Sequence, residues 1–237
     1  MSTYVLIHGA WHGAWCWDNV VSLLEKEGHA VVAPDLPGHG DDKIPIAEVT
    51  LQAYADRVCE VMNAQSEPVI LVGHSLGGIV ITQAAENCPD NILKLVYLTA
   101  FLLQNGEIVL KYAQEDTESL VLPNRVMSED KSYTSLKDEG IRTTFYADCS
   151  DKDVERAKAL LGPQATAPSV TPVSTTKENF GRIPRFYIEC LQDKAISPSI
   201  QKEMYTNLPC EKVISMDTSH SPFFSAPEEL TRHLLSL

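Results

Sequence analysis

Short runs of apolar and β-branched residues alternate with helix-forming segments along most of this chain, and this alternation limits its possible folds most strongly. The four runs within the first hundred residues are apolar throughout, as expected for strands that are buried on both faces. Repeated strand–helix–strand units predict a parallel sheet covered by helices on both faces. The expected strands are Tyr4–Ile7, Ala30–Ala33, Val69–Val72, Leu95–Leu98, Phe186–Cys190 and Lys212–Met216. The expected helices are Trp17–Lys26, Leu51–Ala64, Leu76–Glu86, Pro198–Asn207 and Pro227–Leu237.

The alternation stops between residues 106 and 182. This stretch is polar, contains four prolines and offers only short helical patterns such as Asp151–Leu161. A linker or a separate domain is one interpretation. Because the strand–helix pattern resumes afterwards, we favour an insertion that covers the carboxyl edge of the sheet, where ligands of open α/β sheets bind. The prediction is a core of residues 1–105 and 183–237 with a helical cap of residues 106–182.

The segment VILVGHSLGG, Val69–Gly78, contains the pattern G-x-S-x-G directly after an expected strand and before an expected helix. In that context the pattern indicates a nucleophilic serine on a sharp strand-to-helix turn. Only small neighbours allow the backbone to approach so closely, and Gly73, Gly77 and Gly78 supply them. The helix N-terminus then lies beneath the oxyanion that forms during acyl transfer. Ser75 is the expected nucleophile.

A serine hydroxyl is a weak nucleophile at neutral pH unless an oriented base lies beside it. On this architecture the acid and then the histidine follow the serine along the chain. His220 follows the last expected strand, at the carboxyl edge of the sheet, whereas His233 falls inside the closing helix and is expected at the surface. His220 is therefore the expected base.

The expected acid is Asp193, in the turn that follows the strand Phe186–Cys190 at the same edge. Asp217 is its rival, but three residues are a short span for reaching the far ring nitrogen of His220. Glu189 falls within the strand and is expected to point elsewhere.

The stretch LIHGAWHGAWCW, residues 6–17, holds His8 and His12 four positions apart. Such a pair could bind zinc on one helical face. Here Gly9 and Gly13 interrupt any helix, and no carboxylate or cysteine is spaced to complete a site, so no metal is expected. His8 is expected to be structural, as is His39.

A histidine–glycine loop after the first strand supplies the second oxyanion donor in this architecture. We therefore expect the amides of Ala10 and Leu76 to form the oxyanion hole. Trp15 and Trp17 are expected in the core. The residues expected to line the substrate pocket are Trp11, Phe101 and Ser221.

At these residues the sequence resembles the α/β-hydrolase superfamily, and within it the plant methylesterase and hydroxynitrile lyase family with its bacterial esterase relatives. The similarity covers nearly the whole chain. It implies an α/β-hydrolase fold, an enzyme without a cofactor, and a small apolar pocket under a helical cap.

The resemblance also separates possible reactions. Hydroxynitrile lyases of this family carry a threonine, a cysteine and a lysine at the positions of Gly9, Leu76 and Ser221. Without the lysine, no cation stabilises a departing cyanide, so lyase activity is disfavoured. The expected function is a serine carboxylesterase acting on small, fairly apolar esters. The alternatives are a lyase, a C–C bond hydrolase, or a hydrolase-fold receptor that binds its ligand without turnover.

Net charge limits the partners of this chain. Its 32 acidic against 19 basic residues give a formal charge of −13, which repels nucleic acids and anionic membrane surfaces. The expected partner is a small-molecule ester, and a homodimer is left open. Six scattered cysteines, read as buried thiols, and an N-terminus that enters a strand without a signal peptide predict a cytoplasmic protein.

Overall fold

The computed structural model describes residues 1–237 and contains the predicted parallel sheet. Six strands lie in the order β2–β1–β3–β4–β8–β9, and all neighbouring pairs are parallel. Every residue of β3 is buried, whereas the outermost strands β2 and β9 are largely half-buried or exposed. The bounds of the six strands are β1 Thr3–Ile7, β2 Ala30–Val32, β3 Val69–His74, β4 Ile92–Leu98, β8 Arg185–Cys190 and β9 Lys212–Met216.

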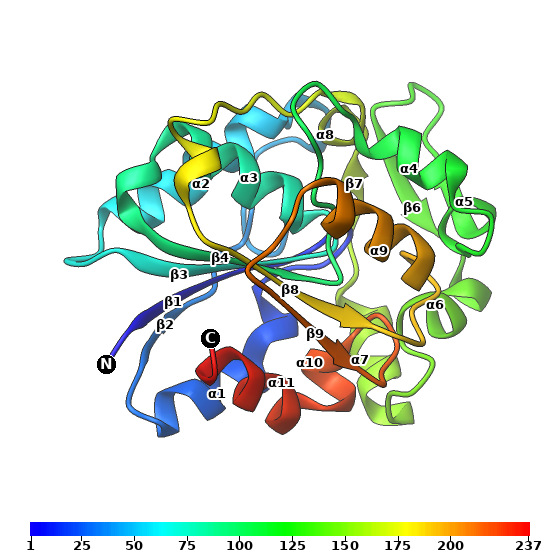
Figure 1. Cartoon of the computed structure of the whole chain (residues 1–237). Helices are drawn as coiled ribbons and strands as arrows, with labels where there is room; N and C mark the ends of the chain where they lie inside the picture. The colour runs from blue at the N-terminus through cyan, green and yellow to red at the C-terminus, as the bar shows by residue number, and fades with distance from the viewer.

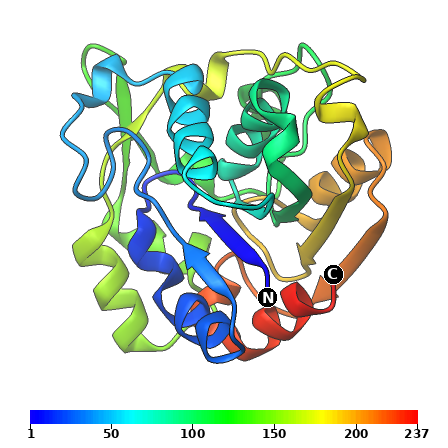
Figure 2. The ribbon, with the colours of Figure 1, turned by 90° about the vertical axis from the view of Figure 1, so that its left-hand side faces the viewer.

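Helices cover both faces of this sheet, as predicted (Figures 1 and 2). Helices α2 and α3 pack together on one face, and α1 packs against α11 on the other. The helices of this part of the chain are α1 Asp18–Lys26, α2 Leu51–Asn63, α3 Gly77–Asn87, α9 Pro198–Asn207, α10 Pro222–Ser225 and α11 Pro227–Leu235. Short 3₁₀ turns are η1 Ala14–Trp17, η2 Ile46–Glu48, η3 Pro89–Asn91 and η4 Phe180–Arg182.

Two of these helices begin at side-chain caps. The hydroxyl of Thr50 accepts a hydrogen bond from the amide of Ala53 at the start of α2, and that of Ser197 accepts one from Ile200 at the start of α9. Each satisfies an amide that the first turn leaves without a partner. The first predicted helix starts differently: η1 precedes α1, and Trp17 is the last residue of that 3₁₀ turn.

Of the segment between β4 and β8, residues 109–170 lie beyond the carboxyl ends of the strands, and residues 174–182 return along α3 (Figure 1). This segment contains the expected short helices and also a three-stranded antiparallel sheet that the sequence did not predict. Its strands have two to four residues, too few for an alternating pattern to emerge. The elements are α4 Val109–Glu115, α5 Val121–Asn124, β5 Arg125–Met127, β6 Tyr133–Leu136, α6 Asp138–Phe145, α7 Asp151–Leu160, β7 Gln164–Ala165 and α8 Ala167–Val170.

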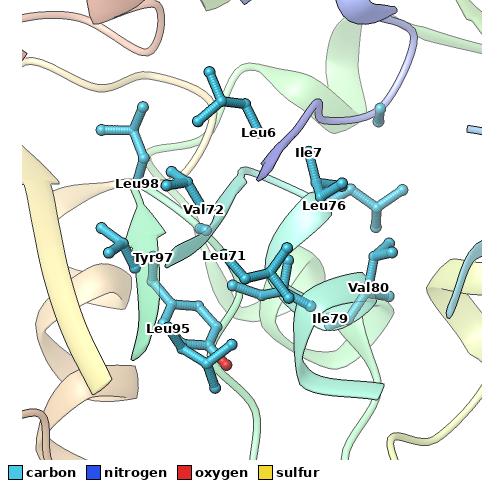
Figure 3. Packing of buried hydrophobic residues seen from close by; sticks show 14 of the residues in the cluster. Leu6, Ile7, Leu71, Val72, Leu76, Ile79, Val80, Leu95, Tyr97 and Leu98 are labelled. Carbon is cyan, nitrogen blue, oxygen red and sulfur yellow. The ribbon is translucent and has the colours of Figure 1, made fainter. Parts of the chain in front are cut away.

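One hydrophobic cluster joins the sheet, its helices and the inserted segment. Figure 3 shows its centre, where side chains of β1, β3, β4 and α3 interdigitate. Ile141, Phe145 and Val154 of the inserted segment belong to the same cluster. This shared packing is what a cap requires and a flexible linker lacks; the boundaries 106 and 182 stay a prediction.

The cysteines correct one expectation. Cys59 of α2 and Cys88, just after α3, form a disulfide with their Cα atoms 6.1 Å apart. The interpretation of all six cysteines as thiols is therefore wrong for these two; the other four are free. The pair escapes sequence analysis because its partners are 29 positions apart and meet only when α2 packs on α3. The cytoplasmic location stays a prediction, and no helix has the length and apolar character needed to cross a membrane.

Besides His220, four histidines are buried near the carboxyl edge of the sheet: His8, His12, His39 and His74. Burial disfavours the charged imidazolium and lowers the pKa of His12 to about 3 and that of His39 to about 4. Burial also holds the pKa values of His8 and His74 well below the ordinary range. All four imidazoles are therefore neutral at pH 7.

We predict that replacing Cys59 and Cys88 by alanine lowers the free energy of unfolding by about 2–4 kcal/mol, because the cross-link restricts the unfolded chain. Urea unfolding measures the loss, with Cys210→Ser as the control that leaves the cross-link intact. Thiol titration of the denatured, unreduced protein should find the four free cysteines. Six titratable thiols would contradict the cross-link.

The free energy of unfolding should fall as the pH drops below about 6.5, because a histidine of the unfolded chain then binds a proton while the buried histidine stays neutral. The folded pKa values lie below the unfolded one, so the contribution is complete above pH 6.5 and is lost toward pH 4. Each such histidine contributes about 1.4 kcal/mol per pH unit. Urea titrations at pH 7.5, 6.5 and 5.5 should show a slope of the unfolding free energy against pH that His39→Gln reduces. Equal stability at all three pH values would refute this prediction.

Candidate active site

Ser75 occupies the turn between β3 and α3 in a left-handed conformation, with φ of 55°. The left-handed region of φ/ψ space is unfavourable for a residue with a side chain. Such residues are typically found at functional sites. A Cβ on Gly73 would lie 2.7 Å from the carbonyl oxygen of Gly77, and one on Gly78 would lie 2.3 Å from that of Phe101. The turn therefore requires glycine at these positions, as the motif predicted.

His220 and Asp193 meet at the same edge of the sheet. The distance between His220 Nδ1 and Asp193 Oδ2 is 2.7 Å, and both side chains are buried. Because an ionised carboxylate only accepts, Nδ1–H is the donor, and Nε2 of the neutral ring is free to accept a proton.

Asp193 is held by three further donors. Its Oδ1 accepts from the amides of Ala195, at 2.6 Å, and Ile196, at 3.0 Å. Its Oδ2 also accepts from the hydroxyl of Thr99. These contacts fix the plane of the carboxylate and thereby the orientation of the His220 ring.

The rival residues lie elsewhere. Asp217 is exposed and accepts from Gln192 at 2.9 Å. Glu189 accepts from the hydroxyls of Tyr205 and Ser215. His233 is half-buried on α11, with Nε2 3.6 Å from Glu229. None of them contacts the His220 imidazole through a hydrogen bond.

The residue before Ser75 connects the turn to the histidine loop. His74 Nε2 donates to the carbonyl oxygen of His220 at 2.8 Å, and the two rings have centroids 4.5 Å apart. The Ser75 hydroxyl itself makes no hydrogen bond with the His220 ring. Catalytic hydrogen bonds commonly tighten only in the complex with substrate.

Sequence reasoning missed two residues that hold this arrangement. Thr99, with φ of 37°, follows β4 and donates to Asp193; its place after a strand at the carboxyl edge was the available signal. Asp148, between α6 and α7, accepts from the amide of Ser219 at 2.8 Å and from its hydroxyl. No motif identifies Asp148, because the contact spans 71 positions.

An apolar cavity of about 110 Å³ adjoins Ser75 and is covered by the inserted segment. Of its 22 lining residues 15 are hydrophobic and only Arg125 is charged, so it suits an uncharged, apolar group. Trp11 and Phe101 line it as expected, and Ser221 does not. Ser221 is fully buried at the start of α10, where its hydroxyl has no hydrogen-bond partner.

The backbone amides of Ala10 and Leu76 belong to residues that line this cavity. Neither N–H donates to another group of the protein. Leu76 immediately precedes α3, so its amide adds to the positive end of that helix. Two free donors beside Ser75 are able to bind a developing negative charge.

No cluster of three or more histidine, cysteine or acidic side chains is arranged to hold a metal ion. Both ring nitrogens of His8 and of His12 have hydrogen-bond partners within the protein. The imidazoles therefore have no free lone pair for a metal, and the absence of a metal requirement stays a prediction.

Comparisons with known proteins agree with this fold. The sequence profile of the alpha/beta hydrolase family matches residues 4–233. Methylesterase 9 of Arabidopsis thaliana is 34% identical, with 100% of this chain and 98% of that protein aligned. The Arabidopsis relative named "Putative methylesterase 11, chloroplastic" is 35% identical over 99% of this chain, which spans only 63% of that protein's length.

Among solved structures, a pyrethroid hydrolase from Sphingobium faniae JZ-2 superposes with a TM-score of 0.90. Its sequence is 30% identical, and the match covers 99% of this chain and 96% of that one. The predicted α/β-hydrolase fold is thus confirmed. The chain belongs to the alpha/beta hydrolase family, within its methylesterase-like group of ester hydrolases.

Proposed function

We propose that this chain is a serine carboxylesterase that hydrolyses small, largely apolar carboxylic esters through an acyl-enzyme. The observation that carries the proposal is the Asp193–His220 hydrogen bond at the sheet edge where Ser75 is held in its left-handed turn. The similarity of this chain to ester hydrolases also supports ester hydrolysis as the reaction.

In the proposed mechanism, Ser75 Oγ attacks the ester carbonyl while His220 Nε2 takes its proton. Asp193 holds the ring through Nδ1 and stabilises the imidazolium. The amides of Ala10 and Leu76 bind the oxyanion. His220 then gives the proton to the leaving alcohol, and a water molecule, activated by the same histidine, hydrolyses the acyl-enzyme.

The cavity limits the substrate. An apolar protein cavity of about 150 Å³ is known to hold benzene, so about 110 Å³ suits a short alkyl group. We propose that short-chain esters are preferred, since longer groups require the inserted segment to move.

The site lacks the cation that the lyase alternative requires. Ser221 stands where the related lyases carry lysine, and its buried hydroxyl does not reach the cavity. The protein should hydrolyse nitrophenyl esters and leave cyanohydrins intact. A receptor without turnover would convert neither substrate, so the two assays distinguish the esterase from the lyase and from the receptor.

We expect Ser75→Ala to lower kcat for a short nitrophenyl ester by about 10³-fold or more, because the nucleophile is lost. Ser221→Ala is a matched control, since that hydroxyl has no partner and does not line the cavity. Thermal unfolding should show that both variants fold. Full activity in a folded Ser75→Ala protein would exclude Ser75 as the nucleophile.

Asp193→Asn should lower kcat by about 10⁴-fold, since an amide favours the wrong imidazole tautomer. Asp217→Asn should retain kcat within about twofold, because Asp217 is exposed and contacts Gln192 instead of His220. Steady-state kinetics of both variants test the assignment of the acid. The reverse order of effects would assign that role to Asp217.

A further inference from the structure

Every backbone carbonyl of the loop 9–12 accepts a hydrogen bond. Side chains hold three of these carbonyls, and in each case the donor is a histidine Nδ1–H, because a carbonyl oxygen only accepts. The pairs are His8 to Gly9 at 2.8 Å, His12 to Ala10 at 2.7 Å, and His39 to His12 at 2.9 Å; the amide of Gly162 holds Trp11 O at 2.9 Å.

The opposite nitrogen of each neutral ring must then accept. His12 Nε2 accepts from the hydroxyl of Tyr146, at 2.5 Å. Tyr146 lies directly after α6 in the inserted segment and is fully buried. A directed relay therefore runs from Tyr146 through the His12 ring to the carbonyl oxygen of Ala10.

A second relay reaches the same loop from the inserted segment. Gln164 Nε2 donates to the hydroxyl of Tyr54 at 3.1 Å, and that hydroxyl donates to His39 Nε2 at 2.9 Å. His39 in turn donates to His12 O. Both relays end on backbone carbonyls, so neither occupies the free N–H groups of Ala10 and Leu76.

Trp11 shows why the loop needs such support. Its φ is 62°, a left-handed value that is unfavourable for a residue with a side chain and persists only when its surroundings fix it. The peptide before Trp11 is held by His12 and the peptide after it by Gly162. The indole N–H also donates to Thr134 O at 3.1 Å. The N–H of Ala10 lies on the preceding Gly9–Ala10 peptide, whose carbonyl His8 holds. His12 holds the next peptide, so loss of its contact would free the Ala10–Trp11 peptide to rotate and would loosen the Ala10 backbone from that side.

We propose that His12 and Tyr146 are positioning residues that fix the backbone on the carboxyl side of Ala10, while His8 fixes it on the amino side, so that the Ala10 amide points toward the oxyanion and the inserted segment completes the oxyanion hole. The inference rests on the proposed esterase function. It assigns the histidine pair of residues 6–17 to backbone support. Neither residue would touch the substrate.

Tyr146→Phe removes one hydroxyl and is the first test. We expect kcat to fall about three- to tenfold with KM within about twofold, since a loosened donor affects the transition state more than the ground state. Tyr112→Phe is the matched control: Tyr112 is equally buried in the inserted segment, but its hydroxyl donates to Glu107. His12→Phe should lower kcat about 10- to 100-fold, and His12→Asn, which keeps a donor near the Nδ1 position, should recover most of it.

A trifluoromethyl ketone provides a readout that a purely structural role would not change. It forms a tetrahedral oxyanion on the serine, so its inhibition constant should rise in Tyr146→Phe by the same factor as kcat/KM falls. The constant for the corresponding methyl ketone should stay unchanged. Equal weakening of both ketones, or unchanged kcat in Tyr146→Phe and His12→Phe, would overturn the proposal.

Amide hydrogen exchange separates this proposal from the proposed function. Exchange in residues 9–12 should accelerate in Tyr146→Phe but not in Tyr112→Phe, whether or not the protein hydrolyses esters. If wild type is no more active than Ser75→Ala, the esterase assignment fails. If wild type is active while exchange and kcat are unchanged in Tyr146→Phe, only the positioning role fails.

Discussion

The left-handed turn at Ser75 is the constraint on which the rest of the site depends. A residue with a side chain holds φ of 55° only where its surroundings leave no alternative. Here β3 is buried between β1 and β4, and the chain re-enters α3 with no room for a Cβ at Gly73 or Gly78. The turn thereby places the hydroxyl at the carboxyl edge of the sheet and the first amides of α3 beneath it. The aspartate and histidine loops reach it because β8 and β9 run parallel to β3 and end at the same edge.

This geometry explains why so much could be predicted from the sequence. Parallel strands buried on both faces are nearly continuous apolar runs, so their order along the chain was clear, and residues after them necessarily share an edge. That rule alone predicted the meeting of Asp193 with His220 and the position of Ser75 at the same edge. Boundaries were less certain where backbone geometry overrides pattern: α3 begins at Gly77 because the turn extends through Leu76.

The features that escaped prediction depend on contacts between distant residues. The sheet β5–β6–β7 uses strands too short to show a period, and the Cys59–Cys88 pair becomes neighbours only through helix packing. Asp148 reaches Ser219 from the inserted segment. Ser221 follows the histidine in sequence but turns inward at α10. His8 and His39 were expected to be structural and His12 was only excluded from a metal site; which carbonyl each of them holds depends on the fold of residues far away.

The disulfide also has a topological consequence. Cys59 and Cys88 close a covalent ring that contains β3, Ser75 and the whole of α3. The strained turn therefore belongs to a cyclic segment, and a single break of the backbone inside the ring leaves both pieces of the protein covalently joined. Within the unfolded chain the ends of this segment also stay close together, which reduces the entropy lost when strand and helix pack. Of the four residues with a side chain that hold a positive φ, only Ser75 thus lies in the part of the molecule that the disulfide encloses in a ring.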